Sequence, residues 1–304
     1  MSTAAYRARK NQNVFRHDRK SARARRDQPE TLRRPDVAEQ RQRLKTKHVL
    51  GWLFLVPGCL FTLIALADLL HSGLRGDLPE SRAFRWFVVG AVCWVALFPL
   101  LRGICMIAYV FGHEMTHILA ARLSGAKVFD WEVSWTGGWV DTDRSNTFIS
   151  LSPYFVPLYT LLIVLVFSAM GPFIDLQQPV APFGQEGWLV IHPLKAMYGL
   201  VGLTWAFHVT YTLYTLKDAQ SDLLRNGEFF SVLLILLLNT LVAAAFLIIA
   251  SPELTWLQAW ECVTRTTEII AGGIWRNLSW LFTSVSQEVN AMPDSIQNWG
   301  HTAE

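Results

Sequence analysis

Several long apolar runs with almost no charge constrain this chain more than any other feature of its sequence. The 304 residues are 52% hydrophobic, and the runs cover 49–70, 83–121, 148–174, 197–216 and 229–250. A helix of about 20 apolar residues crosses the ~30 Å hydrocarbon core of a bilayer, and soluble domains rarely contain several such helices. The sequence therefore predicts an all-α, polytopic integral membrane protein with five or six transmembrane helices in a domain covering 48–250.

The run at 83–121 is about twice the length of one span, and it is interrupted at "PLLRG", residues 99–103. It is either two spans joined by a tight turn at Arg102-Gly103 or one long kinked helix that leaves the membrane. In the second case the basic residues that follow it lie in the cytoplasm, as the positive-inside rule requires, and this alternative is preferred. The residues concerned are Arg122, Lys127, Arg144, Lys217 and Arg225.

The two ends of the chain differ from the membrane domain in charge and pattern. Residues 1–47 carry 15 of the 27 Lys and Arg but only 5 of the 24 Asp and Glu, without apolar periodicity. We expect a disordered basic tail that keeps the N-terminus cytoplasmic, as in a bacterial inner membrane, and no nucleic-acid partner. In 251–304, apolar residues recur near the helical period between charged ones, which predicts an amphipathic C-terminal helix and tail.

One segment carries a β pattern. In "SGAKVFDWEVSWTGGWVDTD", residues 124–143, apolar and polar residues alternate up to a Gly-Gly pair. Alternation with a period of two on both sides of a glycine-rich turn predicts a β-hairpin over Val128–Val140, with Gly137-Gly138 as its turn.

The segment "FGHEMTHILAARL", residues 111–123, places two histidines and a glutamate in an apolar run. His113 and His117 are four residues apart, so a helix puts them on one face, one turn apart. Two imidazoles arranged in this way can bind one Zn²⁺, and Glu114 can take a proton from a water on the metal. Ionisable groups are costly in hydrocarbon and are kept there mainly for function, which favours a metal site over polar residues satisfied within a bundle.

Catalytic zinc needs a third protein ligand, which we expect from the run at 197–216 and the residues after it. If that helix continues, Asp222 lies roughly 40° around its axis from His208 and Asp218 roughly 80°. Asp222 is therefore the favoured metal ligand and Asp218 the alternative, unless both aspartates only mark the aqueous end of the helix. His208 and Thr212 are expected to form hydrogen bonds around the site.

Topology gives a second reason to bring these parts together. One span, 148–174, separates the helix containing His117 from the helix at 197–216. The two helices are then parallel, with their C-terminal ends on one side, so His117 and Asp222 can meet.

Taken together, these segments resemble the site-2-protease-type intramembrane zinc metalloproteases, and more closely their compact bacterial (peptidase M50B-like) relatives. The resemblance covers roughly 110–240 and rests on "HEMTHILAARLSGAKV", "GGWV", "SPYFVPLYTLL" and "FHVTYTLYTLKDAQSDLLRNGEFFS". The chain has "QSDLLRNG" where the family usually has an Asn-Pro-Asp-Gly or Leu-Asp-Gly type motif, and it has no PDZ-like insert.

The resemblance implies a membrane-embedded Zn²⁺ held by His113, His117 and Asp222, with Glu114 as the general base. The activity implied is hydrolysis of peptide bonds in a membrane-protein substrate within the lipid bilayer, and the Val128–Val140 hairpin could hold that substrate as an added strand. The rival hypothesis is a non-catalytic membrane scaffold or chaperone with a structural or vestigial metal site. Glu114 favours the enzyme, because a structural site needs only the ligands. The sequence does not indicate an oligomeric state.

Overall fold

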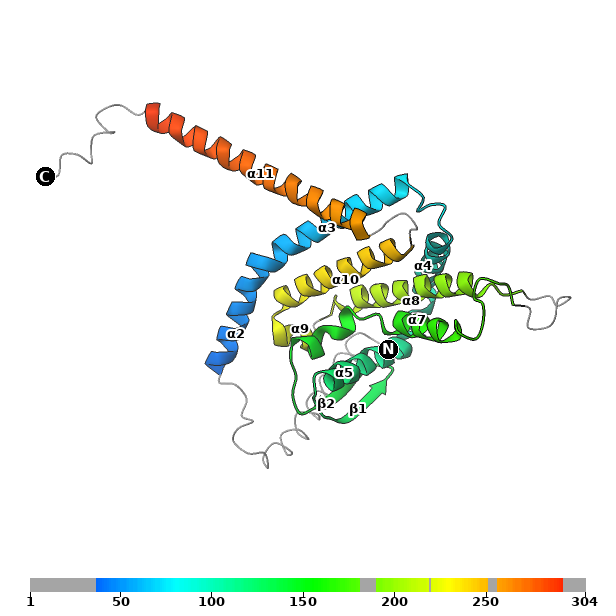
Figure 1. Ribbon diagram of the computed structural model, residues 1–304. Coiled ribbons are helices and arrows are strands. Elements are labelled where there is room, and N and C mark those ends of the chain that lie inside the picture. The colour runs from blue at the N-terminus through cyan, green and yellow to red at the C-terminus, as the bar shows by residue number, and fades with distance from the viewer. Residues whose placement is uncertain (1–36, 181–189, 219, 251–255, 292–304) are drawn as a thin grey trace.

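The computed structural model describes residues 37–180, 190–218, 220–250 and 256–291. They are mostly helical, with one two-stranded antiparallel sheet among them (Figure 1). The helices and strands in chain order are α2 (Val37–Leu50), the π-helical η2 (Gly51–Leu55), α3 (Val56–Arg75), α4 (Arg82–Leu101), α5 (Met106–Leu123), β1 (Val128–Ser134), β2 (Gly137–Thr142), α6 (Thr147–Leu151), the 3₁₀ turn η3 (Ser152–Tyr154), α7 (Leu158–Met170), α8 (Pro193–Thr215), α9 (Ser221–Asn226), α10 (Glu228–Ala250) and α11 (Trp256–Ala291).

Three helices in the described part of the chain are long and apolar enough to cross a membrane, which indicates a membrane protein. They are Glu39–Arg75, Arg82–Leu101 and Glu228–Ala250, and a bent pair, Thr147–Tyr154 with Leu158–Met170, would make a fourth. The sequence predicts five or six. The difference lies in α5 and α8, which are not among these candidates. Both helices carry titratable residues, and both bury many of their residues against other parts of the protein.

The pairing of α4 with α8 is the most extensive helix contact and depends on two glycines, Gly90 and Gly202. A Cβ atom on Gly90 would lie 1.8 Å from the carbonyl oxygen of Gly199, and one on Gly202 would lie 1.9 Å from that of Phe87. The two backbones therefore touch, as small residues allow in membrane helix pairs. Farther along the pair, Trp94 packs against Phe207 and donates a hydrogen bond from Nε1 to Thr210 Oγ1 at 2.8 Å. This contact runs in parallel along both helices, so their C-terminal ends lie together.

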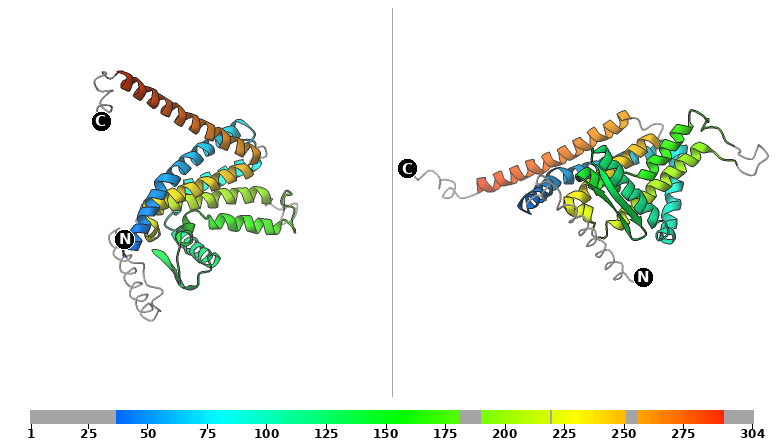
Figure 2. Two further views of the ribbon diagram at one scale, coloured as in Figure 1. Left: turned by 60° about the vertical axis from the view of Figure 1, so that its left-hand side comes forward. Right: turned by 90° about the horizontal axis from the view of Figure 1, so that it is seen from below.

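The region 83–121 is two helices rather than one. α4 ends at Leu101 and α5 begins at Met106, so the single kinked helix that we preferred is wrong. The hypothesis of two spans is not borne out either, because α5 is not long and apolar enough to count as a span. Instead α5 lies at one end of the bundle, against the hairpin and η3 (Figures 1 and 2).

The expected span at 148–174 is bent by 78° between η3 and α7. Pro153 and Pro157 explain the break, because proline lacks the N–H that continues a helix and restricts the residue before it. Asn239 stabilises the bend by donating from Nδ2 to the carbonyl oxygen of Tyr154 at 2.9 Å. The bend carries Tyr154 toward α5.

The N-terminal region also differs from expectation. Residues 1–36 lie outside the described part of the chain, but Val37–Lys47, which we expected to be disordered, belong to α2. Two contacts explain the order: Glu39 and Arg43 form an ion pair one turn apart, and Lys47 Nζ donates to Asn226 Oδ1 at 2.6 Å and to Thr147 Oγ1 at 3.0 Å. The basic segment therefore ends at the same end of the bundle as α5 and α9.

The hairpin forms where it was predicted, with Trp131 opposite Val140 and Ser134 opposite Gly137. The turn itself was predicted wrongly. This register makes Trp135 and Thr136 the turn residues and places the two glycines in β2. Gly137 has a φ of +144°, a conformation that favours glycine.

The last described segment of the chain is a single helix of 36 residues, α11. Near its start, Cys262 and Thr266 are buried, and Arg265 forms an ion pair of 2.8 Å with Asp68 of α3. Beyond these residues α11 extends away from the rest of the molecule (Figures 1 and 2).

Candidate metal centre

Helix α5 presents the two histidines on one face, as their spacing predicts. The imidazole rings of His113 and His117 lie edge to face with their centroids 4.9 Å apart. Both side chains are largely buried, at 13% and 12% exposure. Buried polar groups need partners, so the contacts of the four ring nitrogens decide what this pair can bind.

Asp222 faces both histidines from α9. Its Oδ2 atom lies 3.7 Å from His113 Nε2 and 3.4 Å from His117 Nε2, and these three donor atoms are within 4.8 Å of one another. Burial alone would raise the pKa of the Asp222 carboxyl, but hydrogen bonds from the two imidazoles lower that pKa below its usual range. The carboxylate is thus available as an anionic ligand.

The Nε2 atoms of both histidines face Asp222, and the other two ring nitrogens have partners elsewhere. His117 Nδ1 lies 2.7 Å from the carbonyl oxygen of Ile149. A carbonyl can only accept, so Nδ1 carries a hydrogen, and in the neutral imidazole Nε2 is the nitrogen with the lone pair. His113 Nδ1 lies 3.4 Å from the hydroxyl of Tyr109, which in turn lies 3.0 Å from Thr215 Oγ1. Such outer contacts orient histidine ligands in metal sites, so the donor set of two imidazoles and one carboxylate fits a divalent ion such as Zn²⁺.

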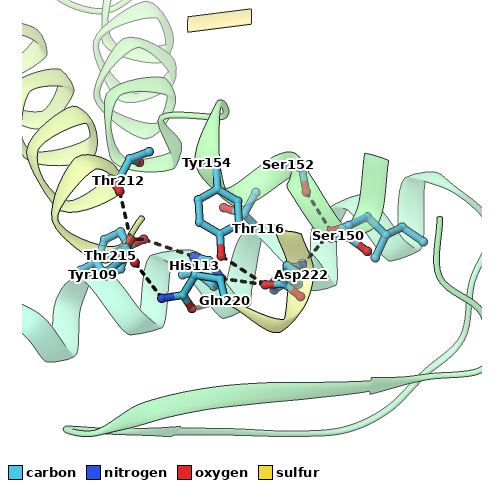
Figure 3. A network of polar contacts seen from close by, with 12 residues as sticks. Tyr109, His113, Thr116, Ser150, Ser152, Tyr154, Thr212, Thr215, Gln220 and Asp222 are labelled. Carbon is cyan, nitrogen blue, oxygen red and sulfur yellow. Dashed lines mark hydrogen bonds and ion pairs between the residues drawn. The ribbon is translucent and has the colours of Figure 1, made fainter. Parts of the chain in front are cut away.

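Tyr154 approaches the group from η3. Its ring meets that of His113 edge to face at 5.1 Å, and its hydroxyl donates to Asp222 Oδ2 at 3.4 Å. Figure 3 shows Tyr154 and Asp222 reaching the α5 histidine from two different elements. In the same view Gln220 lies beside the group, where its Nε2 donates to the carbonyl oxygen of Thr215 at 2.8 Å. This hydrogen bond ties the start of α9 back to the end of α8.

Glu114 is only 6% exposed and lies under the hairpin. It is not one of the three metal-binding candidates, but it is close enough to interact electrostatically with His117 and Asp222. A Cβ atom on Gly138 would lie 2.4 Å from Glu114 Cγ, so β2 fits against this side chain only because residue 138 is glycine. The hairpin therefore restricts where the Glu114 carboxylate can lie.

The other residues singled out in the sequence, Asp218, His208 and Thr212, are not among the three candidate ligands. Asp218 is exposed and does not belong to the donor group. His208 and Thr212 are buried on α8, but neither His208 Nε2 nor Thr212 Oγ1 has a hydrogen-bond partner in the described structure. His208 is close enough to His113 to interact with it electrostatically, and it forms a hydrogen bond with the backbone of Tyr154. Direct contacts with the ligand candidates come from Tyr109, Tyr154 and the carbonyl of Ile149.

Of these supporting groups, only Tyr109 left a signal in the sequence. It precedes His113 by four residues and so shares its helix face. Ile149 and Tyr154 reach the site from α6 and η3, the short segment before the bend, whose position no periodicity predicts.

Comparisons with protein-family models, with curated proteins and with solved structures found no match to this chain.

Proposed function

We propose that this chain is an intramembrane zinc-dependent endopeptidase that hydrolyses peptide bonds of membrane proteins. One observation carries the proposal: two segments of the chain bring His113, His117 and Asp222 together beside a buried glutamate. Three protein ligands leave one coordination position of zinc open, which distinguishes catalytic sites from closed structural ones. An adjacent carboxylate is what hydrolysis needs in addition.

The residues divide the chemistry between them. A Zn²⁺ ion bound here supplies Lewis acidity, which polarises a carbonyl and makes water a nucleophile at neutral pH. Glu114 accepts the proton of that water and then delivers it to the amine that leaves. Tyr154 holds Asp222 through its hydroxyl and lies against His113, so it keeps both ligands in position.

The hairpin is suited to holding the substrate. It lies directly over Glu114, and in the described part of the chain β1 and β2 pair only with each other, so each has one edge without a neighbouring strand. A substrate segment must be extended before its peptide bonds become accessible, and an open strand edge binds extended backbone by hydrogen bonds. We therefore place the scissile bond between a hairpin edge and the proposed zinc site.

The position of Lys47 favours a site that opens to the cytoplasm. Lys47 ends the basic segment and contacts Asn226, four residues after Asp222. If the positive-inside rule places residues 1–47 in the cytoplasm, α5, α9 and the hairpin are at that face. Five spans then follow: the long N-terminal helix, α4, the bent pair, α8 and α10. In this arrangement the start of α8 and the end of α10 lie at the opposite face.

The experiment has two stages that separate binding from chemistry. Metal analysis of the purified full chain is expected to give about one zinc per protein, lost in His113→Ala and Asp222→Ala and retained in the matched control Asp218→Ala. Membrane proteomes of cells producing wild type or Glu114→Gln are then compared for new peptide termini.

New termini that need Glu114, with zinc retained in Glu114→Gln, would support the peptidase. Zinc retained without any Glu114-dependent termini would favour the scaffold or chaperone. Equal metal content in wild type and all variants would show that His113 and Asp222 do not bind the metal, and would refute the proposed site.

A further inference from the structure

A pocket of about 560 Å³ lies at the opposite end of the bundle from the proposed zinc site, between the first turns of α4 and α8. Four of the residues lining it are basic or imidazole side chains: Arg82, Arg85, His192 and Lys195. None of its lining residues is acidic. Lys195 and Thr215 are 20 residues apart on α8, so the pocket and the zinc site are separated by roughly 30 Å.

The cations of this pocket lack counter-ions. Within the described part of the chain, no ion pair or side-chain hydrogen bond involves Arg82, Arg85 or Lys195. Arg82 and Arg85 are three residues apart on one helix face, where like charges repel. The pocket therefore concentrates positive charge that no acidic side chain in the described ranges neutralises.

Helix dipoles add to this charge. The pocket lies at the N-terminal ends of α4 and α8, which are 20 and 23 residues long, and neither helix has an acidic residue in its first turn. A helix N-terminus carries partial positive charge and favours anions, so lysine and arginine are unfavourable there. Two such ends and three unpaired cations together form an anion site, and arginine is suited to the geometry of phosphate.

The apolar residues that line the pocket indicate which kind of molecule presents the anionic group. Trp86 and Val89 line it and are exposed, at 39% and 48%. Arg82 begins a helix that is long and apolar enough to cross a membrane, so the pocket lies where the surface of a bilayer would meet α4. Tryptophan is enriched at that depth, which is the level of the phospholipid headgroups.

We propose that this pocket binds a phosphate group, presented by the headgroup of an anionic phospholipid at the face opposite the zinc site. Arg82, Arg85 and Lys195 bind the phosphate, and Trp86 and Val89 contact the glycerol and the upper acyl chain. The orientation proposed above makes cations at this face exceptions to the positive-inside rule, and a bound anion accounts for them. The pocket does not depend on the peptidase proposal.

The test uses the full chain reconstituted in vesicles of equal phosphatidylglycerol and phosphatidylcholine, then released for native mass spectrometry. Wild type is expected to retain phosphatidylglycerol in preference to phosphatidylcholine. The triple variant Arg82→Gln, Arg85→Gln, Lys195→Gln is expected to lose at least tenfold of that preference. The matched control is Arg122→Gln, Lys127→Gln, Arg276→Gln, which removes the same charge from exposed positions elsewhere.

A second arm titrates wild type with inorganic phosphate by calorimetry. Binding of phosphate that needs the three cations, without lipid preference, would support the site with a free anion as its source. No binding in either arm, or equal binding by wild type and the triple variant, would overturn the proposal. Far-UV circular dichroism and thermal unfolding check the fold of each variant, and Arg85→Gln alone replaces the triple variant if that one fails to fold.

Discussion

Replacing Gly202 by alanine should separate α4 from α8 and destabilise the protein. A Cβ atom at Gly202 would lie 1.9 Å from the carbonyl oxygen of Phe87, whereas ordinary contacts begin near 3.4 Å, so the helices must move apart by roughly 1.5 Å. The obstacle is backbone, which no rotamer change relieves. Overpacking of this kind costs about 3 kcal/mol, against about 1 kcal/mol gained from the better helix propensity of alanine. We expect a net loss of about 2 kcal/mol.

Gly199→Ala is the matched control on the same helix. The nearest atom to its added Cβ, the carbonyl oxygen of Trp86, would be 3.8 Å away, which is ordinary contact. This variant should keep the propensity gain, so the two alanine variants should differ by about 3 kcal/mol, or about 6–12 °C in Tm. Thermal unfolding in detergent, followed by tryptophan fluorescence, measures the difference. Equal Tm values for the two variants would show that the backbones of α4 and α8 are not in contact.

Three further predictions concern the proposed zinc site. Tyr109→Phe should lower zinc affinity 10- to 100-fold in chelator competition, because His113 Nδ1 loses its partner, whereas Tyr214→Phe should not. Gly138→Ala should retain zinc but lose roughly 100-fold in Glu114-dependent cleavage, because the added Cβ displaces the Glu114 side chain by about 1 Å. The control Gly103→Ala should cleave normally, because no atom lies within 4 Å of its added Cβ. Free zinc at 100 times its Kd should stabilise wild type by about 2.7 kcal/mol in thermal unfolding, and Asp222→Asn, but not Asp218→Asn, should abolish that shift.

The sequence predicts those parts of the fold that depend on local residue patterns, namely the helices and the hairpin, but not how the helices pack. Run lengths predict helices, and alternation predicts the hairpin. The spans expected at α5 and α8 rested on run length, and the polar and titratable residues of both helices, which set them apart from the three candidate spans, were given too little weight. The bend before α7 was also missed, although Pro153 and Pro157 stand in the sequence, because a long apolar run outweighed the two prolines.

The site was predicted in part, and partly for the wrong reason. The spacing of His113 and His117 correctly predicts one helix face. The preference for Asp222 over Asp218 assumes a helix that continues past residue 216, whereas α8 ends at Thr215 and Asp222 lies on the separate helix α9. Likewise, the argument that brings His117 to Asp222 treats α5 as a span. Tertiary contacts, among them the bond from Gln220 to Thr215, bring the carboxylate to the histidines, and no sequence periodicity encodes them.

Alanine scanning would not detect one contact that orients the proposed ligand His117, because that contact is made by a main-chain atom. The oxygen beside His117 Nδ1 belongs to the main chain of Ile149, so truncating the Ile149 side chain leaves it in place. What fixes that oxygen is the first turn of α6, where Asn146 Oδ1 accepts a hydrogen bond from the Ile149 N–H at 2.8 Å. A screen of alanine variants for lost metal binding should therefore identify Asn146, which acts on His117 only through the Ile149 main chain, and should miss Ile149 itself.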